Sequence, residues 1–339
     1  MELLILTPGF PQNEEDTTCI PYLQDFVLGL QQYYPDLHIK IITFQYPFQR
    51  GHYTWHGIPV FSAGGANRKG LFRWLTWRRV KRQAAQWINK ETVVHSFWLT
   101  EAAEVAADIA RKNRLKHIAT IMGQDALLTN AYLQRIPFGE LQVVAPNEKA
   151  AGYFHIHTAR DVAAIIPHAI APIPFVVSER DIDVLFVGSF IELKQPFLFV
   201  EVAASLSARW PHLHAEMMGD GLLLQEVTAA IQEQSLPITL HGKTDRKAVH
   251  AAMLRTKVLV HTSRYEGHST VISEALACGC RVVCFAVGHA AHPHIEEVAD
   301  IAEMIAAVEN ALSAPSLSSG YYPEAQQEAL QAYMHLYRG

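Results

Sequence analysis

Short apolar runs alternate with longer helical patterns along this chain, and that rhythm constrains the fold more than any other feature. In the first half we expect strands at residues 3–6, 39–44, 93–95, 118–122, 143–145 and 163–166, and helices at 21–34, 70–90, 99–112, 125–134 and 147–154. In the second half we expect strands at 184–187, 215–218, 238–241, 258–261 and 281–284, with helices between them. Alternation of this kind is typical of α/β domains built on parallel sheets.

A proline-rich break separates the two series. PHAIAPIPFVVSERD, residues 167–181, contains three prolines followed by charges, as linkers do. The chain of 339 residues is about twice the usual length of one domain. We therefore expect two Rossmann-like domains facing one another across a cleft: residues 1–170, then residues 171–320, with 321–339 as a C-terminal helix that crosses back to the first domain.

Charge and hydropathy disfavour several classes of protein. The chain has 28 basic and 33 acidic side chains, a net charge of −5, so we expect no general binding of nucleic acid. The first apolar run is broken by Pro8 and is shorter than the core of a signal peptide. No run approaches the roughly 18–20 apolar residues of a membrane span. We expect a cytoplasmic protein.

Clusters of cysteine and histidine do not have the spacing of a metal site. The cysteines are Cys19, Cys278, Cys280 and Cys284. The last three follow C-x-C-x₃-C, which is not the spacing of a zinc ribbon, so we interpret all four as small reduced core residues, with zinc binding as the alternative. We assign His289, His292 and His294 to a loop, and we expect no metal.

Two common nucleotide-binding motifs are missing. The segment TPGFPQNEEDTT after the first strand has no G-x-G-x-x-G, which argues against a nicotinamide or flavin enzyme. No G-x-x-x-x-G-K-[ST] occurs, which disfavours a P-loop nucleotidase. We expect no cofactor.

The segment RYEGHSTVISEALACG, residues 264–279, places two glutamates near one helix start. Ser269 or Thr270 can serve as its N-cap, and Gly279 suits a left-handed stop at its end. Free backbone N–H groups at such a start favour an anion, for example a diphosphate. Glu266 would lie in the preceding turn, and Glu274 could accept two hydroxyl protons from a ribose. A solvated helix face is the alternative reading of both acids.

The second half resembles the retaining GT-B glycosyltransferases that carry an E-x₇-E motif, the group 1 or family 4-like glycosyltransferases. The matching motifs, in order, are FVGSFIELK, MGDG at 218–221, LHGKTDRKAVHAAM with VLVHTSRYEG, and EGHSTVISEALACGCRVV. VVHSFW at 93–98, GQDA at 123–126 and IIPHAI at 165–170 match the first domain of that family more loosely.

The resemblance implies a role for each matching residue. Lys194 would contact the donor diphosphate, Glu266 would hold the donor sugar, and Glu274 would bind the ribose. The remaining donor-side candidates are Gly188, Ser189, Lys243, Arg264, Gly267, His268, Ser269 and Thr270. Retention of configuration by attack on one face of the sugar, without a metal, is likewise implied by the family.

Some positions depart from the family pattern. Ser189 stands where many relatives have arginine, so donor binding would depend more on Lys194, Arg264 or Lys243. Met122 stands where many have histidine. The first loop lacks a Gly-Gly pair and offers Asp16 and Thr17 as acceptor-side candidates. After residue 288 the chain lacks the usual glycine-containing strand region.

Two further residues are candidates for the acceptor side. We expect His95 and Asp125 at the ends of first-domain strands, facing the crevice. Asp125 could orient an acceptor hydroxyl or take its proton, and the alternative is an N-cap of the following helix. The alternative for His95 is a packed strand-end histidine.

Residues 68–87, RKGLFRWLTWRRVKRQAAQW, contain seven basic residues and no acid. As a helix, one stripe (Trp74, Trp77, Val80, Ala84, Trp87 and Ile88) would pack on the sheet. Arg78, Arg79 and Arg82 would point outward near Phe72 and Leu75. This pattern indicates contact with an anionic membrane or a lipid-linked acceptor, and a solvated basic face is the alternative.

The leading hypothesis is a hexosyltransferase in cell-surface polysaccharide synthesis, acting at the inner face of the membrane. It would use a UDP- or GDP-sugar and a saccharide or lipid-linked acceptor. The alternatives are a non-catalytic nucleotide-sugar-binding protein and a GT-B epimerase or phosphorylase.

Overall fold

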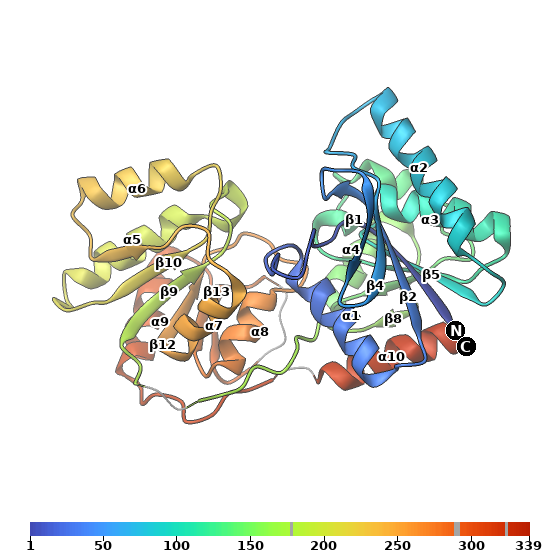
Figure 1. Cartoon of the computed structure of the whole chain (residues 1–339). Coiled ribbons are helices and arrows are strands. Elements are labelled where there is room, and N and C mark those ends of the chain that lie inside the picture. Colours follow the sequence, from blue (N-terminus) through green and yellow to red (C-terminus); the bar gives the residue numbers. More distant parts are fainter. Residues whose placement is uncertain (177–178, 288–291, 323–324) are drawn as a thin grey trace. The chain divides into compact units, whose positions relative to one another are not determined.

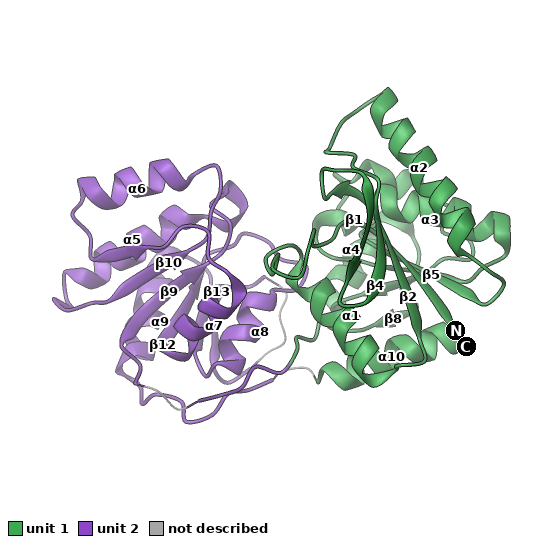
Figure 2. Cartoon of the chain, viewed as in Figure 1, with its two compact units in different colours: residues 1–171, 324–339 green, residues 172–323 purple. Residues whose placement is uncertain are grey.

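The computed structural model describes residues 1–176, 179–287, 292–322 and 325–339. The chain divides into two compact units (Figure 2). Unit 1 comprises Met1–Ala171 and Glu324–Gly339, and unit 2 comprises Pro172–Pro323. The first passage between the units falls inside the proline-rich segment 167–181.

Unit 1 is a sheet of eight strands in the order β3-β4-β2-β1-β5-β6-β7-β8, covered by helices (Figure 1). Its strands are β1 (Glu2–Gly9), β2 (His38–Tyr46), β3 (Gly51–Trp55), β4 (Ile58–Ser62), β5 (Thr92–Phe97), β6 (His117–Thr120), β7 (Gln142–Ala145) and β8 (Ala164–Ile165). Its helices are α1 (Pro21–Tyr33), α2 (Leu71–Trp87), α3 (Glu101–Asn113), α4 (Glu148–Thr158) and α10 (Gln326–Arg338). Among the described strands of this sheet, β3 and β4 form the antiparallel pair, and the other pairs are parallel. The central strands are buried on both faces, which explains their continuous apolar runs.

Unit 2 is a six-stranded parallel sheet in the order β11-β10-β9-β12-β13-β14. The strands are β9 (Ile182–Val187), β10 (Ala215–Met218), β11 (Ile238–Leu240), β12 (Thr256–His261), β13 (Arg281–Phe285) and β14 (Ile295–Val298). The helices are α5 (Pro196–Ser207), α6 (Leu224–Glu233), α7 (Arg246–Leu254), α8 (Thr270–Ala277) and α9 (Ile301–Ser313). Each unit thus has its own sheet and its own core.

The strands expected from the sequence are confirmed, with small shifts at their ends. Three strands were not expected: β3 and β4, which form a hairpin, and β14, which pairs with β13. The absence of a strand after residue 288 was therefore a wrong prediction. The helix expected at 125–134 is also wrong, because two short 3₁₀ helices, Gln124–Ala126 and Ala131–Gln134, replace it.

Helix α10 packs on unit 1. Leu330, Tyr333 and Tyr337 are buried there, and α10 lies against α1. Tyr333 Oη lies 3.0 Å from the hydroxyl of Thr120 on β6. A Cβ atom added to Gly29 of α1 would lie 2.6 Å from Leu330 Cδ1, so glycine permits the close approach of the two helices.

The cysteines agree with the core interpretation at three positions. Cys278, Cys280 and Cys284 are buried and form no disulfide with one another, at the end of α8 and along β13. Cys19 differs, because it is only half-buried in the first loop. His292 and His294 precede β14, and the His292 ring stacks on Tyr321 at 3.8 Å. His289 lies outside the described residues.

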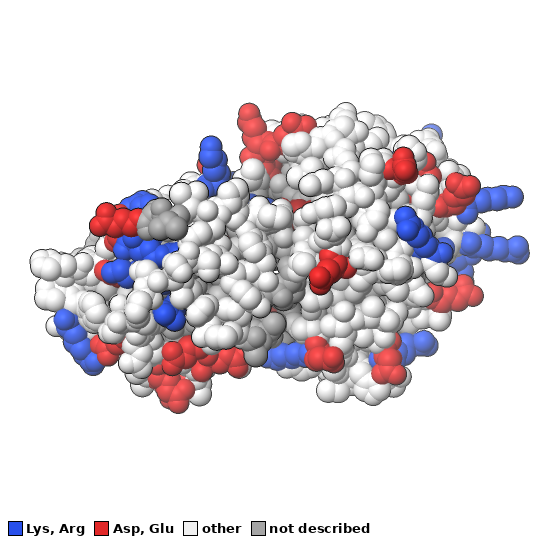
Figure 3. Space-filling view, turned by 90° about the horizontal axis from the view of Figure 1, so that it is seen from below, with Lys and Arg blue, Asp and Glu red and all other residues white. Residues whose placement is uncertain are grey.

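Charged side chains are mixed on the face drawn in Figure 3, where Lys and Arg stand among Asp and Glu in small groups. Within the described residues, no helix is long and apolar enough to cross a membrane.

Candidate functional site

Two loops of unit 2 meet at the carboxyl edge of its sheet. β9 leads into the loop of residues 188–195, and β12 leads into the loop of residues 262–269. The two strands are neighbours, with Leu185 opposite Leu259, so both loops emerge at one edge. Ligands of open parallel sheets bind at such an edge.

Lys194 and Glu266 form an ion pair across these two loops. Nζ of Lys194 contacts Oε1 of Glu266 although the residues are 72 positions apart. The same oxygen lies 3.1 Å from Nε2 of His261, the last residue of β12. All three side chains are largely withdrawn from solvent. The fold therefore places a cation, a carboxylate and an imidazole at one point.

The backbone holds the Lys194 loop against the end of β12. The hydroxyl of Thr262 donates to the carbonyl oxygens of Lys194 at 2.7 Å and of Gln195 at 3.0 Å. The N–H of Arg264 donates to Leu193 O at 3.0 Å. Gln195 has a φ of 47°, and Pro196 then begins α5. The position of Lys194 is thus set by three backbone contacts as well as by its own charge.

The pKa of Glu266 is low because charge outweighs burial. Burial by itself raises this pKa, but the hydrogen bond with His261 and the positive charge of Lys194 lower it from 4.5 to about 2. Glu266 is therefore a carboxylate throughout the neutral range. A permanently ionised group suits electrostatic stabilisation better than proton transfer at neutral pH.

This low pKa gives an expected pH dependence of stability. The folded pKa lies below the unfolded value, so the contribution of ionised Glu266, about 3 kcal/mol, is present above pH 4.5 and is lost as the pH falls toward 2. The difference in unfolding free energy between wild type and Glu266→Gln should be constant above about pH 5 and shrink below it. Urea titrations from pH 7 down to the acid limit measure this difference. A difference independent of pH would contradict the assigned pKa.

Helix α8 begins at Thr270, just after the turn that carries Glu266, as expected. Ser269 is its N-cap residue, but the hydroxyl makes no capping bond and lies instead 3.4 Å from His261 Nε2. Gly279 has a φ of 72° after the helix end, which confirms the left-handed stop. His268, Ser269 and Thr270 lie at the helix start with low exposure.

Glu274 is buried inside α8 and paired with α7. Its Oε1 accepts from Nε of Arg246 at 2.8 Å and lies 3.2 Å from Nε2 of His250. Burial raises its pKa, but His250 and Arg246 lower it below the usual value. The solvated-face alternative is wrong for Glu274, which is 5 % exposed. His261, Arg246 and His250 were not expected from the sequence, although Arg246 and His250 stand four residues apart on one helix face.

The loop of Gly188 and Ser189 packs on the MGDG segment. The N–H of Gly188 donates to Met218 O at 3.0 Å. Gly219 has a φ of 144°, and a Cβ atom there would lie 1.8 Å from Gly188 O. Gly219 is therefore required for the two loops to touch. Lys243 follows Gly242, whose carbonyl accepts from Gly219 N at 2.8 Å, so it belongs to the same edge.

Asp125 organises a loop in unit 1. Its carboxylate accepts backbone N–H groups of Leu99 at 2.8 Å, Gly123 at 2.6 Å and Met122 at 3.1 Å. Burial raises its pKa, and these bonds oppose the rise. The N-cap alternative fails because the bonded N–H groups precede Asp125 and no long helix follows. The geometry favours a structural role over contact with an acceptor.

His95 lies in the core of unit 1 and not at a surface. Its exposed fraction is 0 %, and its ring nitrogens lie 2.7 Å from Tyr337 Oη and 2.8 Å from Thr120 Oγ1. Burial holds its pKa well below the usual value. The expectation that His95 faces a crevice is contradicted, because α10 covers it. The alternative interpretation, a packed histidine at the end of a strand, agrees with the burial and the contacts of His95.

The first loop of unit 1 borders a cavity of about 480 Å³ at the carboxyl edge of that sheet, after the ends of β1 and β2. The lining residues are Gln12, Asn13, Pro47, Phe48, Gln49, Arg50, Gly51, His52 and Tyr53. Asp16 supports the loop by accepting from Tyr46 Oη at 2.7 Å and from Gln12 N at 3.3 Å. Thr17 follows in the same loop, and neither Asp16 nor Thr17 lines the cavity.

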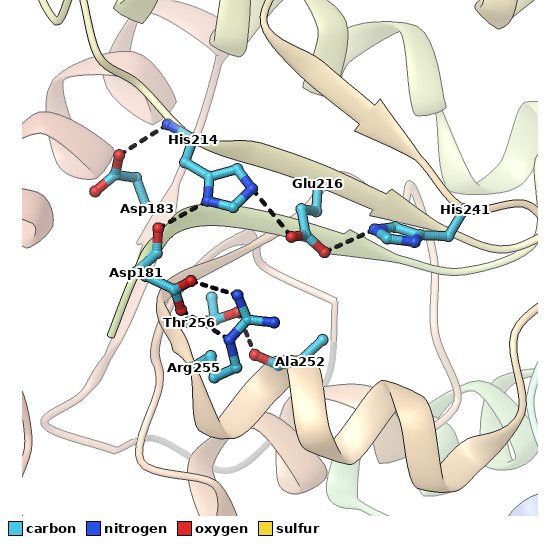
Figure 4. Close-up of polar contacts among 8 residues, drawn as sticks. All are labelled: Asp181, Asp183, His214, Glu216, His241, Ala252, Arg255 and Thr256. Carbon is cyan, nitrogen blue, oxygen red and sulfur yellow. Dashed lines mark hydrogen bonds and ion pairs between the residues drawn. The ribbon is translucent and has the colours of Figure 1, made fainter. Parts of the chain in front are cut away.

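A separate polar cluster lies toward the amino ends of β9 and β12 (Figure 4). Lys257 pairs with Asp183 at 2.7 Å, on the same two strands that carry the Lys194 and Glu266 loops at their other ends. Glu216 lies between two imidazoles, 3.1 Å from His214 Nε2 and 2.8 Å from His241 Nε2. In the part of the chain that the structure describes, no group of three or more His, Cys, Asp or Glu could hold a metal ion.

Comparison with known families places a match on unit 2. Residues 173–311 match the model of the family described as Glycosyl transferases group 1. An uncharacterized glycosyltransferase of Methanocaldococcus jannaschii is 24 % identical over 202 residues, which are 58 % of this chain and 56 % of that protein. The chain thus spans about half the length of the curated relative it matches.

Solved structures are similar over both units. HepE of Anabaena, in complex with UDP and glucose, has a TM-score of 0.69 at 15 % identity, covering 100 % of this chain and 97 % of its own. A UDP-forming α,α-trehalose-phosphate synthase from Burkholderia vietnamiensis has a TM-score of 0.68 at 12 % identity, covering 99 % and 93 %. TarM, which was also solved as a mutant of the S. aureus protein, has a TM-score of 0.62 at 12 % identity, covering 78 % of this chain and 58 % of its own. The chain has the GT-B fold, an α/β fold of two Rossmann-like domains.

Proposed function

We propose that this chain is a retaining glycosyltransferase that moves a hexose from a UDP- or GDP-sugar to a saccharide or lipid-linked acceptor without a metal ion or cofactor. The observation that carries the proposal is the pairing of Lys194 with Glu266 at the carboxyl edge of the unit 2 sheet. The family match over residues 173–311 and the similarity to proteins solved with UDP and glucose support it.

The donor would lie over the start of α8. We assign the diphosphate to Lys194 and to the N–H groups at residues 267–270, because a cation and a helix start both attract an anion. Lys194 and His261 both contact Oε1 of Glu266, so we assign its Oε2 to the donor sugar. Glu274 is the ribose ligand in this proposal, and Arg246 and His250 fix its orientation.

The transfer step would break one bond and form one. The bond from the anomeric carbon to the diphosphate oxygen breaks, and the acceptor oxygen bonds to that carbon on the same face. The acceptor hydroxyl proton passes to the departing phosphate oxygen. Negative charge develops on the departing diphosphate during this step. The ammonium of Lys194 stabilises this charge more strongly in the transition state than in the bound donor.

Unit 1 would bind the acceptor at its cavity beside the first loop. Amide and aromatic side chains suit the hydroxyl groups and apolar faces of a sugar, and Gln12, Asn13 and Phe48 supply such groups. Arg50 adds one positive charge, which favours a saccharide that carries an anionic group. We place Asp16 and Thr17 in the support of this cavity, and Asp125 in the support of the loop of residues 122–125.

Thermal unfolding with nucleotides and nucleotide sugars tests donor binding. UDP or GDP at about 100 times its Kd should raise the Tm by about 5–10 °C, while ADP should not. Release of the diphosphate from the matching nucleotide sugar, followed with and without added saccharides, then tests turnover. The anomeric configuration of the product reports retention.

The outcomes separate the alternatives. Stabilisation without any release of diphosphate favours a non-catalytic nucleotide-sugar-binding protein. Release of a free sugar or its epimer without an acceptor favours an epimerase. The absence of any stabilisation by all nucleoside diphosphates would overturn the proposed donor site.

A further inference from the structure

The first turns of α2 present large apolar side chains to solvent. Leu71 is 69 % exposed, Phe72 56 % and Trp74 53 %. The inward face of α2 is made by Val80 and Ala84 together with polar residues. The expectation that Trp74 packs on the sheet is therefore wrong. In Figure 1 the start of α2 extends away from the strands of unit 1.

Arginines accompany the exposed apolar residues. Arg78 and Arg82 follow Leu71 by seven and eleven positions, which are about two and three turns, so they lie on the same face of α2 as Leu71. The Arg78 guanidinium lies 5.6 Å from the centre of the Trp74 ring. We call Leu71, Phe72, Trp74, Arg78 and Arg82 the α2 patch. It is both apolar and cationic, and residues 68–87 contain no acid.

Other cations of the segment have structural partners. Arg79 donates to Ala63 O at 3.2 Å, and Lys81 pairs with Asp108 at 2.7 Å. These contacts fix α2 on unit 1. The cations of the α2 patch are therefore presented by a helix that is anchored on its other face.

We propose that the α2 patch docks this protein on the surface of a bilayer that contains anionic phospholipids. Leucine, phenylalanine and tryptophan beside arginine are the residues of helices that lie in a membrane interface. Trp74 can insert among headgroups, and Arg78 and Arg82 can meet their phosphates. Nucleic acid would attract the arginines but would leave Leu71 and Phe72 exposed. The net charge of −5 requires such an attraction to be local.

Co-sedimentation of the full chain with vesicles tests this docking. Vesicles of phosphatidylcholine with phosphatidylglycerol should bind the protein, and vesicles of phosphatidylcholine alone should bind it at least about tenfold more weakly. The variant L71S/F72S/W74S should lose at least about tenfold in binding, because its apolar contact is removed. The variant R78Q/R82Q should lose about 20-fold, and high salt should imitate it.

A matched control comes from α4. Ile156 is 71 % exposed, close to the 69 % of Leu71, but stands outside the patch. I156S should bind vesicles like wild type, while L71S should bind more weakly. Both sites are exposed, so both variants should keep the wild-type Tm. Trp74 fluorescence should shift to the blue with anionic vesicles, and W74F should lack this shift.

Three results would overturn the proposal. The first is equal binding of L71S and I156S, and the second is equal binding to neutral and anionic vesicles. The third is that the wild-type protein is a dimer that binds no vesicles, while L71S/F72S/W74S is a monomer. This result would assign the patch to contact with a second copy of the chain. None of these depends on turnover, so a failure here leaves the transferase proposal standing.

Discussion

Lys194→Met and Glu266→Gln should each lower the rate of sugar transfer by at least about 100-fold. Lys194 is the cation that we assign to the departing diphosphate, and loss of one contact to developing charge costs this much in other enzymes. Steady-state release of UDP or GDP from the donor measures the loss. The fall should appear in kcat, because the contact strengthens as charge develops.

A double variant separates chemistry from folding. Each single variant leaves one charge of the ion pair without its partner, which costs stability, whereas K194M/E266Q removes both charges. The double variant should therefore be more stable than the less stable single variant and still be inactive. Activity that follows stability across the three variants would assign the pair a structural role only.

Lys257→Met is the matched control. Lys257 pairs with Asp183 on the same two strands, β12 and β9, but toward their amino ends. This variant should keep at least about half of the wild-type kcat, since it lies away from the carboxyl edge. Near-normal turnover in Lys194→Met, or an equal loss in Lys257→Met, would defeat the site assignment.

Gly219→Ala should destabilise unit 2 by about 3–5 kcal/mol. The φ of 144° is unfavourable for alanine, and the new Cβ atom would lie 1.8 Å from the backbone oxygen of Gly188. Backbone cannot move aside as a flexible side chain can, so the loop of residues 188–195 must shift and the donor should bind more weakly. Denaturant unfolding and the Tm shift with UDP or GDP measure both effects.

Gly242→Ala separates the cost of the positive φ from the cost of the close contact with Gly188 O. Gly242 also has a positive φ, 68°, but apart from its chain neighbours no heavy atom of the described residues lies within 4 Å of the position of a Cβ atom there. This variant should lose only about 1–2 kcal/mol, the cost of the backbone conformation. Equal losses of unfolding free energy in the two variants would show that the contact of the new Cβ atom with Gly188 O adds nothing to the destabilisation.

The sequence predicts the buried strands well and the edge strands poorly. β1, β5 and β9 lie between neighbours and consist of apolar runs that need no context to be recognised. β3 and β14 lie at sheet edges, and their sequences GHYTW and IEEV place polar side chains in solvent. The helix expected at 125–134 failed because Asp125 uses its carboxylate to fold the preceding loop.

The sequence predicted only those site residues that belong to one continuous segment of the chain. Glu266 and Glu274 stand out because a helix start and a known motif surround them. Their partners are not visible in the same way, because Arg246 lies 28 residues from Glu274 and His261 belongs to a strand whose end only the fold defines. His95 misled because a histidine at the end of an apolar run gives no sign that a helix from residues 326–338 will cover it.

The course of the chain through α10 affects the order in which the protein can be completed during synthesis. All of unit 2 has been made once residue 323 leaves the ribosome, whereas unit 1 lacks Tyr333 and Tyr337 until residue 337 has been made. Nδ1 of His95 can contact the hydroxyl of Tyr337, and the hydroxyl of Thr120 that of Tyr333, only after both tyrosines have been made. Unit 2 is thus an insertion in unit 1, and we expect it to finish folding before the unit that begins first.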